Sequence, residues 1–321
     1  MNSAVTISQP SGPELPALIV QAGERATWRF LEFFTVNIRN KNTRAAYTVA
    51  ARAFLHWCEQ NGMMELADVK PIHVAAYIEH LQGKMKAPSV KQHLACIRML
   101  FSWLVTGQII PLSPAAEVRG PRYSIKKGST TVMSSQETTD FLKSIDTSHI
   151  VGLRDRAFIA VMAYTFARVS AVVSLKVEDY FRLKKRWWLR LQEKGGKVNE
   201  MGCHHKLEQY LDEYIAAAGI GEDKKGPLFR AVIGRTKTLS DRPISRVDAW
   251  YMVRRRARDA GVEGAICNHS FRAIGITDYM NNGGDITIAQ RMAGHEDIST
   301  TRLYDRRNDD IDFGEIERVG I

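Results

Sequence analysis

The stretch His269-Ser-Phe-Arg272, followed by Gly294-His295 and then by Thr300-Thr301-Arg-Leu-Tyr304, is the part of the sequence around which the chain is organised. His269 and Arg272 are three residues apart, which is one turn if the segment is helical, so both side chains can face one pocket. Two histidines, an arginine and a tyrosine this close in sequence suit the binding of a phosphodiester and its attack by a phenol oxygen. We therefore expect the rest of the chain to support such a pocket.

The composition is that of an ordinary soluble globular protein. The chain has 321 residues, of which 45% are hydrophobic and 25% charged, and a chain of this length predicts two domains with cores of their own. The sequence shows neither a signal-peptide pattern nor an apolar run of about eighteen residues. We therefore expect no membrane partner and a location in the bacterial cytoplasm or in association with the nucleoid.

The net charge is the first feature of the sequence that indicates a class of binding partner. The formal charge is +10, and an excess of Lys and Arg is typical of proteins that neutralise phosphates. Residues 1–127 carry 15 basic and 8 acidic side chains, residues 128–307 carry 29 and 22, and residues 308–321 carry 1 and 5. This pattern indicates two basic bodies and a short acidic tail. A solvated basic surface with no ligand is the alternative.

The cysteines give no sign of a disulfide framework or a metal site. They are scattered without a C-x-x-C pair, so we expect free thiols. Cys203-His204-His205 resembles a fragment of a metal site, but no second cluster lies at ligand spacing. We therefore expect no metal there.

The first half of the chain reads as a helical bundle. Residues 1–24 contain three prolines among small residues and predict a loose N-terminal arm. Residues 25–118 predict a bundle of about four helices, because apolar residues recur at spacings of three and four and no strand pattern occurs before residue 120. We expect helices from Thr27, from a cap at Asn42 or Thr43 to Asn61, from Pro71 to Leu81, and after Pro88-Ser89.

Two features of this half carry residue types that bind nucleic acid. The first is the exposed starts of the helices, and the second is the basic stretch 119–131, which we expect to be a domain linker. Both could follow a phosphate backbone, so the two halves could close around a duplex. Solvated surface charge is the alternative at each position. The candidate DNA-binding residues are Thr43, Arg44, Lys91, Gln92, Arg122 and Lys126.

The second half, residues 132–307, predicts a mixed but mainly α domain with a small antiparallel sheet. Ser134-Ser135 before Glu137 is a helix-capping signal, and the segment from Leu153 to about Phe166 is apolar nearly all round, which is typical of a central buried helix. Arg168 follows it directly. Trp187 to Leu191 alternate and then reach a Gly-containing turn, which predicts a β-hairpin with lysines at its tip. Residues 226–243 are expected to form a loop.

Phosphoryl transfer to a side-chain oxygen needs cations, a nucleophile and an acid for the leaving oxygen. Arg168 and Arg272 can supply the cations, Tyr304 the nucleophile and Lys194 the acid, while His269 and His295 can bind the phosphate or move protons. No carboxylate cluster suited to Mg²⁺ accompanies these residues. We therefore expect no metal and no cofactor.

These residues, in this order and at this spacing, resemble the tyrosine recombinases, or phage integrase family. The family pattern is Arg, a hairpin Lys, His-x-x-Arg, Gly-His, and a Tyr nine residues later. It is matched by Arg168, Lys194, His269, Arg272, His295 and Tyr304.

The resemblance implies a fold and a reaction. The helical first half would be a SAM-like core-binding domain, and residues 132–307 would be the catalytic domain. Tyr304 would form a 3′-phosphotyrosyl link while Lys194 protonates the 5′-oxygen, without ATP. Four copies of the chain would act on double-stranded DNA carrying a specific site and pass through a Holliday junction, and accessory DNA-bending proteins could join them. Integration, excision and resolution of DNA all remain open.

Two positions depart from the family pattern. An acidic residue usually stands three positions after the first arginine, where this chain has Ala171, and Thr165-Phe-Ala-Arg168 replaces a commoner glycine-containing form. We expect either that Asp179 or Glu178 orients Arg168 instead or that Arg168 is held less firmly.

The general acid has rivals. Lys197 lies at the other end of the turn that carries Lys194, and Lys237 is a weaker candidate. In the acidic tail, 308–321, Phe313, Ile316 and Val319 form a small apolar face, and we expect residues 309–321 to pack on a neighbouring copy or on their own catalytic domain.

Two other functions are compatible with parts of this pattern. A type IB topoisomerase would share the nicking chemistry without exchange of strands between partners, and the family-like helical first half argues against it. A non-enzymatic helical DNA-binding protein would tolerate Tyr304→Phe.

Overall fold

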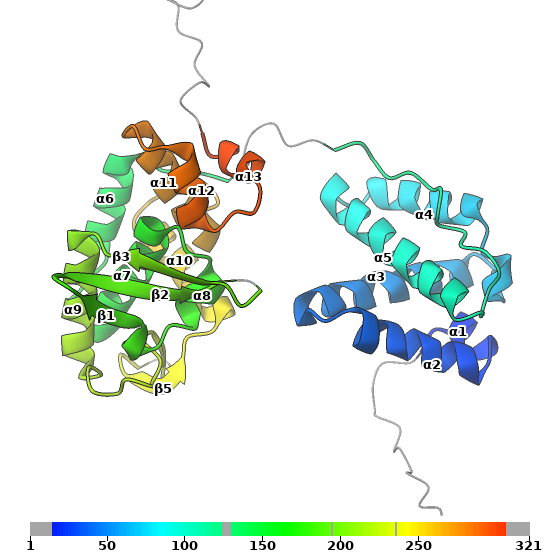
Figure 1. Cartoon of the computed structure of the whole chain (residues 1–321), viewed down its shortest axis with the longest axis horizontal. Helices are drawn as coiled ribbons and strands as arrows, with labels where there is room; N and C mark the ends of the chain where they lie inside the picture. Colours follow the sequence, from blue (N-terminus) through cyan, green and yellow to red (C-terminus); the bar gives the residue numbers. More distant parts are fainter. Residues whose placement is uncertain (1–14, 124–129, 194, 235, 306–321) are drawn as a thin grey trace, which may run out of the picture. The chain divides into compact units, whose positions relative to one another are not determined.

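The periodic apolar segments of the first half of the chain are helices in the computed structural model (Figure 1). The structure describes residues 15–123, 130–193, 195–234 and 236–305. It divides the chain into two compact units, Met1–Ser124 and Ile125–Ile321. Lys194, Lys126 and the acidic tail lie outside the described residues, so the expectations for them stay predictions.

The regular elements in the described part of the first unit are all helical. Its elements are α1 (Ala17–Gln21), α2 (Glu24–Glu32), the π-helical turn η1 (Phe33–Asn37), α3 (Lys41–Gln60), the 3₁₀ turn η2 (Leu66–Asp68), α4 (Pro71–Gln82) and α5 (Ala87–Thr106).

The start of α3 differs from the expectation. Asn40, and not Asn42 or Thr43, caps this helix: its side-chain oxygen accepts the backbone N–H groups of Asn42 and Thr43 at 3.0 and 3.1 Å. A capping side chain must precede the first free N–H groups of the helix, which moves the cap upstream of the expected positions.

Apolar faces of α3, α4 and α5 meet in the core of the first unit. Phe54 of α3 lies edge-on to Tyr77 of α4 and to Phe101 of α5, with ring centroids 5.1 and 5.9 Å apart. The buried Tyr77 hydroxyl and His93 Nδ1 form a hydrogen bond of 3.2 Å, so this core also satisfies its polar groups.

The second unit contains eight helices and five strands among its described residues. They are α6 (Ser135–Ser144), α7 (Ile150–Thr165), α8 (Val169–Val173), the 3₁₀ turn η3 (Val177–Asp179), β1 (Tyr180–Leu183), β2 (Arg186–Gln192), β3 (Val198–Gly202), α9 (His205–Ala218), β4 (Arg230–Val232), β5 (Leu239–Pro243), α10 (Arg246–Asp259), α11 (Asn268–Asn281), α12 (Ile286–Ala293) and α13 (Ile298–Arg302).

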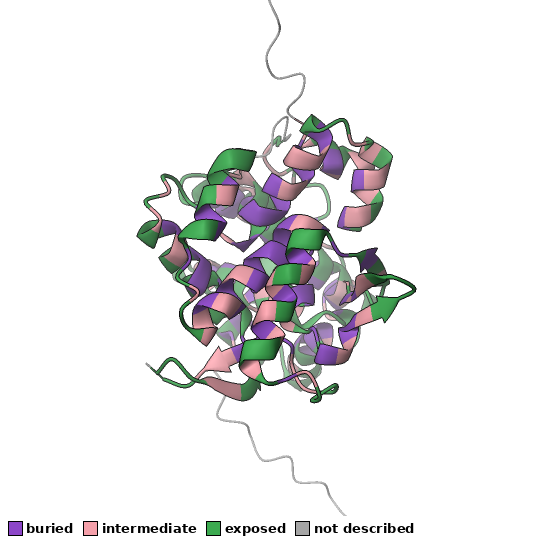
Figure 2. Ribbon diagram, turned by 90° about the vertical axis from the view of Figure 1, so that its left-hand side faces the viewer, coloured by how far each residue is buried: buried purple, intermediate pink, exposed green. Residues whose placement is uncertain are grey.

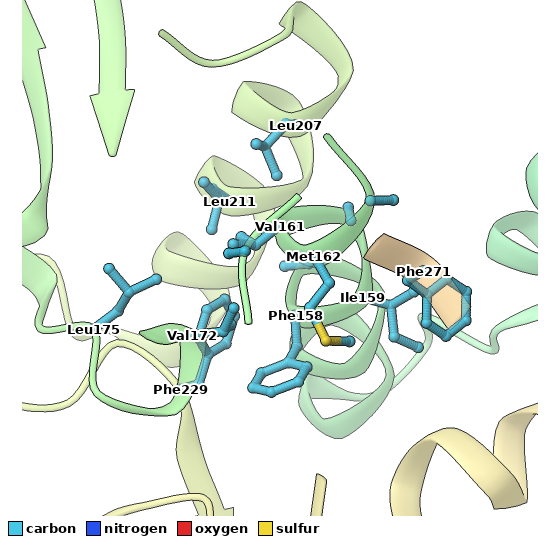
Figure 3. Packing of buried hydrophobic residues seen from close by; sticks show 14 of the residues in the cluster. Phe158, Ile159, Val161, Met162, Val172, Leu175, Leu207, Leu211, Phe229 and Phe271 are labelled. Carbon is cyan, nitrogen blue, oxygen red and sulfur yellow. The ribbon is translucent and has the colours of Figure 1, made fainter. Parts of the chain in front are cut away.

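Helix α7 is the central helix of this unit, as its uniformly apolar sequence predicts. Its Phe158, Ile159, Val161 and Met162 are fully buried. Figure 3 shows them surrounded by side chains from α8, α9 and α11 and by Phe229. The C-terminal end of this largely buried helix is followed by Phe166, Ala167 and then Arg168.

The strands correct the sequence prediction in part. The expected hairpin is β2–β3, paired from Trp188–Gly202 to Gln192–Val198. A third strand, β1, pairs with β2, and β4 and β5 form a second, two-stranded sheet where a loop was expected. Strands of three to five residues carry too little alternation to be recognised, so their tertiary partners decide their conformation.

Burial in this unit follows the helix faces (Figure 2). Inward faces are buried, while outer faces and turns are exposed. None of the helices in the described part of the chain combines the length and the apolar character that a membrane crossing requires.

Candidate active site

Helix α11 places His269 and Arg272 on one face. The helix begins at Asn268, and the Ser270 hydroxyl accepts the backbone N–H of Cys267 at 3.2 Å, which closes the first turn. The two side chains are one turn apart and therefore point to the same side, as the sequence predicts.

Arg272 is a buried cation that ties two helix ends together. Only 1% of the residue is exposed. Its Nη1 donates to the carbonyl of Phe166 at the end of α7, and its Nη2 donates to the carbonyl of Ala293 at the end of α12 at 2.6 Å. Burial, and then the charge of Arg168, lower its pKa to about 10, so the guanidinium is still charged at neutral pH. Two neighbouring cations, one of them buried, create a positive potential that favours an anion such as a phosphate.

Tyr304 lies against His269. Its hydroxyl oxygen is 2.8 Å from His269 Nε2, only 8% of the residue is exposed, and it belongs to a buried cluster with Phe166 and apolar residues of α11 and α12. Burial raises the pKa of the Tyr304 phenol, and the charges of Arg272 and Arg168 partly offset this rise. His269 is exposed by its accessible surface, yet the protein atoms that surround its ring, and then the charges of Arg272 and Arg168, lower its pKa. Both groups are therefore neutral at pH 7, and in the tautomer with the ring proton on Nδ1 the imidazole accepts a hydrogen bond from the phenol.

His295 stacks on the ring of Tyr304. Its ring is parallel to the Tyr304 ring, with an angle of 8° and centroids 5.8 Å apart. Thr301, which is fully buried, holds His295 Nδ1 through its hydroxyl at 2.9 Å. Burial, followed by the charges of Arg272 and Arg168, lowers the pKa of His295 to about 4, so this imidazole is also neutral.

Arg168 completes the group, but its orienting acid is not the expected one. Its Nη1 donates to Glu193 Oε2 at 2.6 Å and its Nη2 to the carbonyl of Gly294 at 3.4 Å. Glu178 instead pairs with Lys225 at 2.8 Å, and Asp179 accepts the backbone N–H of Lys176 at 2.9 Å. The expectation of Asp179 or Glu178 was therefore wrong.

The described residues beside Lys194 belong to the same site. Glu193 and Gly195, on either side of it, line a hollow of about 570 Å³ together with Arg168 and His295. Lys197 lines this hollow too, and its Nζ is 3.3 Å from Glu296.

Lys237 is remote from this hollow. It contacts His149, the N-cap of α7, whereas Arg168 follows the other end of that helix, roughly 24 Å away at the rise of an α-helix. Lys237 therefore lies too far from Tyr304 to act as the general acid.

Comparisons with known proteins agree with this geometry. The model of the phage integrase family matches residues 131–310, and the model of the phage integrase N-terminal SAM-like domain matches residues 28–110. The chain belongs to the phage integrase family. Members of this family are the tyrosine recombinases, so the chain is a DNA strand transferase that acts in DNA recombination.

Individual relatives have low sequence identity to the chain, but the similarity covers most of its length. The chain is 26% identical over 274 residues to tyrosine recombinase XerD of Corynebacterium glutamicum, covering 82% of this chain and 86% of the relative. The fold is similar to that of a XerH site-specific recombinase bound to a palindromic difH substrate in a post-cleavage complex, with a TM-score of 0.70, 18% identity, and 86% of this chain and 79% of the other covered. A lambda integrase tetramer bound to a Holliday junction gives a TM-score of 0.65 at 15% identity, with coverage of 89% and 80%.

The first unit of this family member gathers basic residues around a second hollow of about 450 Å³. Lys91 and Arg122, both predicted to bind DNA, line it together with Arg98 and Arg119. Arg98 was not predicted, although it lies seven residues after Lys91 and hence on the same face of α5. Its guanidinium also donates to the carbonyls of Ala115 and Val118.

The other predicted DNA-binding residues are placed differently. Thr43 and Gln92 are exposed. Arg44 donates twice to the carbonyl of Ile38, at 3.1 and 2.9 Å, and so stabilises the entry to α3.

Glu193 and Thr301 are the residues of the site that sequence reasoning missed. Glu193 is an acidic residue next to Lys194, in a chain that lacks the usual acid at position 171. These two facts together could have identified Glu193 as a partner of Arg168. The contact of Thr301 with His295 depends on the turn before α13 and could not be read from spacing.

No group of three or more His, Cys, Asp or Glu side chains that could hold a metal ion occurs in the described part of the chain. In the Cys203-His204-His205 segment, the His204 ring stacks on Tyr164 at 4.7 Å and its Nδ1 accepts the N–H of Lys206 at 3.2 Å. His204 thus caps and packs the start of α9.

Proposed function

We propose that the protein is a site-specific recombinase that cuts and rejoins duplex DNA through a 3′-phosphotyrosyl link to Tyr304. The observation that carries this proposal is the 2.8 Å contact between the Tyr304 hydroxyl and a neutral His269, beside the charged, buried Arg272. A phenol next to a proton acceptor and two cations is equipped to attack a phosphodiester.

In the proposed cleavage step, the Tyr304 oxygen attacks phosphorus and its proton passes to His269 Nε2. The bond from phosphorus to the 5′-oxygen breaks, and Lys194 protonates that oxygen. Arg168 and Arg272 neutralise the charge on the non-bridging oxygens. Attack by the 5′-hydroxyl of another strand reverses the step, so each phosphorus–oxygen bond broken is replaced by one formed and ATP is not consumed.

His295 is proposed to bind a phosphate oxygen. In the tautomer we favour, the Thr301 hydroxyl donates to Nδ1 and the ring proton resides on Nε2, which donates to the phosphate. The low pKa of His295 supports this role, because a neutral ring donates a hydrogen bond without giving up its proton.

The domains are proposed as a core-binding domain at residues 25–118 and a catalytic domain at 132–307, joined by the linker 119–131. The arm was expected to span 1–24, but Ala17–Gln21 is helix α1, with Leu18 and Ile19 buried in the core of the first unit, so the proposed arm ends before α1. The acidic tail 308–321 follows the catalytic domain. The family models, which match 28–110 and 131–310, and the division of the chain near Ser124 support these limits.

The proposed partners are double-stranded DNA with a specific site and three further copies of the chain, which act through a Holliday junction. The lambda integrase tetramer on such a junction, similar in fold to this chain, supports this assembly. Accessory DNA-bending proteins are partners that the proposal admits, and the bacterial cytoplasm is its proposed place of action.

The DNA contacts of the first unit are proposed to come from Thr43, Arg44, Lys91, Gln92 and Arg122, with Lys126 in the linker. The shared hollow of Lys91 and Arg122, with its further arginines, supports phosphate binding there.

A nicked suicide duplex tests the proposal. Selection of bound duplexes from a random pool with the Tyr304→Phe variant first supplies the cognate site. The wild-type chain is expected to form a covalent adduct on that site when the strand is nicked near the cleavage point. The short fragment that carries the 5′-hydroxyl then diffuses away and cannot reverse the step. Tyr304→Phe is expected to bind the same duplex and form no adduct. Absence of an adduct with the wild-type chain, or an adduct with the variant, would contradict the proposal.

A further inference from the structure

Arg168 needs a partner that its own helix does not supply. It is the N-cap residue of α8, and the position three residues later is Ala171, which is 1% exposed and packed in the core. An arginine that must hold a phosphate in one geometry loses binding energy when its guanidinium is free to rotate. The orienting group has to come from elsewhere in the fold.

Glu193 occupies that place. Its carboxylate is 2.6 Å from Arg168 Nη1, and its side chain is only 6% exposed, while that of Arg168 is 36% exposed. A carboxylate this well covered requires a charged or hydrogen-bonding partner, and a charge-assisted hydrogen bond of this length is of the strong kind. The buried Glu193 carboxylate therefore fixes the orientation of the more exposed Arg168 guanidinium.

The pair leaves the arginine free to bind substrate. A guanidinium has five N–H donors, of which one is directed to Glu193 and one to the carbonyl of Gly294. The remaining donors suffice for the bidentate contact that Arg makes with a phosphate.

Glu193 is itself held in place by the hairpin. Its backbone N–H donates to the carbonyl of Lys197 at 2.7 Å, which closes the β2–β3 turn. The Asn199 side chain donates to the carbonyl of Met292 at 3.1 Å and fastens β3 to the end of α12. The carboxylate is thus a fixed point between the turn that carries Lys194 and the loop that carries His295.

We propose that Glu193 is the positioning residue of Arg168, in place of an acid at position 171. The inference rests on the proposed function, because it assigns Glu193 a part in the same cleavage step. Glu193 acts through Arg168 and does not touch the reacting atoms.

The test is the single-turnover rate of adduct formation on the suicide duplex. Glu193→Gln keeps the shape of the side chain and removes its charge, so it is expected to slow adduct formation about 100-fold, the cost of a misplaced phosphate-binding group, with DNA binding unchanged. Glu200→Gln is the matched control. Glu200 is in the same hairpin and pairs with Arg190 at 2.9 Å, and its replacement is expected to leave the rate unchanged.

A double-mutant comparison identifies the residue through which Glu193 acts. With Arg168→Ala as the background, Glu193→Gln is expected to cause no further loss. A second loss of about 100-fold, equal to that in the wild-type background, would show that Glu193 acts independently of Arg168.

A substrate with sulfur in place of the bridging 5′-oxygen separates Arg168 from Lys194. A thiolate leaves without protonation, since a thiol has a pKa of about 8.5, so this duplex rescues defects in the general acid. Glu193→Gln is expected to remain slow on it. Full recovery would place the effect on Lys194 and overturn the proposal.

Two further outcomes separate the inference from the proposed function. Adduct formation by the wild-type chain, with Glu193→Gln equally fast, would overturn the role of Glu193 alone. A wild-type chain that forms no adduct would overturn both. Glu193→Asp retains the charge, so it is expected to fold like Glu193→Gln and to recover part of the rate. If misfolding caused the slow rate of Glu193→Gln, restoring the negative charge in Glu193→Asp would not recover it.

Discussion

Phe166 ends α7 in the left-handed region of the backbone, with φ of 55°. A bulky side chain in that region is uncommon and strained. The strain coincides with function, because the carbonyl of Phe166 receives Arg272 and Arg168 follows two residues later. Phe166 thus stands where the commoner form of this motif has a glycine, in a backbone conformation that favours glycine. The burial of its ring offsets the conformational strain of the left-handed backbone.

Substitutions at Phe166 are expected to reverse the usual order of Ala and Gly. Both lose the ring, at about 3–5 kcal/mol, but glycine also relieves the left-handed strain. Phe166→Gly is therefore expected to be more stable than Phe166→Ala by about 1 kcal/mol. Urea denaturation of the two variants measures this difference. An alanine variant as stable as the glycine variant would show that the backbone is unstrained.

The His269–Tyr304 pair makes a prediction about pH. His269 accepts the phenol proton only when it is neutral, and its pKa lies below the ordinary value near 6.5. The rate of adduct formation is therefore expected to be level near neutral pH and to fall only as the pH drops below about 6.5. His269→Gln is expected to lower the rate by about 100-fold or more and to remove this acid limb.

His204→Gln is the control for that series, since His204 also has a lowered pKa but packs on Tyr164 away from the site. Single-turnover rates between pH 5 and 9, a span of roughly two units on either side of neutrality, provide the measurement. An acid limb that persists in His269→Gln would assign it to another group.

At the residue scale, the order of the motif residues predicted which side chains come together. Arg168, His269, Arg272, His295 and Tyr304 are joined in one site, as their resemblance to the family pattern implies. Their supporting contacts were not predictable, because they depend on where unrelated backbone segments end. Glu193 reaches Arg168 from a turn 25 residues later in the sequence.

At the element scale, long periodic helices and the hairpin followed from sequence, and short elements did not. Helices α4, α5 and α7 have apolar repeats that tertiary packing reinforces. Strands β1, β4 and β5 are short and take their conformation from pairing. The helix pair α7–α11 is the element contact on which the site depends, because the two helices carry Phe166 and Arg272.

Gly275 permits that contact. A Cβ at this position of α11 would lie 1.9 Å from the carbonyl oxygen of Ala163 and 2.8 Å from the Phe166 ring. Gly275→Ala is therefore expected to push α11 away from α7, with a loss of about 3 kcal/mol or more, and to reduce adduct formation through the displaced Arg272. Gly221→Ala is the control, since its Cβ would meet only Ile215 at an ordinary 3.7 Å. Thermal unfolding and adduct assays of both variants provide the test, and a Gly275→Ala chain with wild-type stability would contradict the packing described.

At the scale of the whole molecule, length predicted more than one compact unit, which the structure has, whereas charge alone indicated a nucleic-acid partner and left a solvated basic surface as the alternative. The net charge of +10 is shared by both halves of the sequence. Base preference was not predictable, because it depends on which side chains enter which groove and on how readily the DNA deforms.

The basic hollow of the first unit predicts a salt effect. Lys91→Gln and Arg122→Gln are each expected to weaken DNA binding and to lower the slope of log Kd against log salt by about 1, as the loss of one phosphate contact requires. Lys225→Gln, which removes the same charge from a lysine paired with Glu178, is expected to leave the slope unchanged. Fluorescence anisotropy with the cognate duplex at a series of salt concentrations measures the slopes. Unchanged slopes for the first two variants would exclude the hollow from the DNA interface.

Tyr304 is the proposed nucleophile, and this role is tested by identifying the residue that becomes joined to DNA. The adduct formed on the nicked duplex is digested with protease and nuclease, and the remaining nucleotide-bearing peptide is sequenced by mass spectrometry. We expect a single modified peptide with the 3′-phosphate on Tyr304. A phosphate on another residue, or a link through the 5′-phosphate, would contradict the role of Tyr304 as the nucleophile that forms a 3′-phosphotyrosyl link.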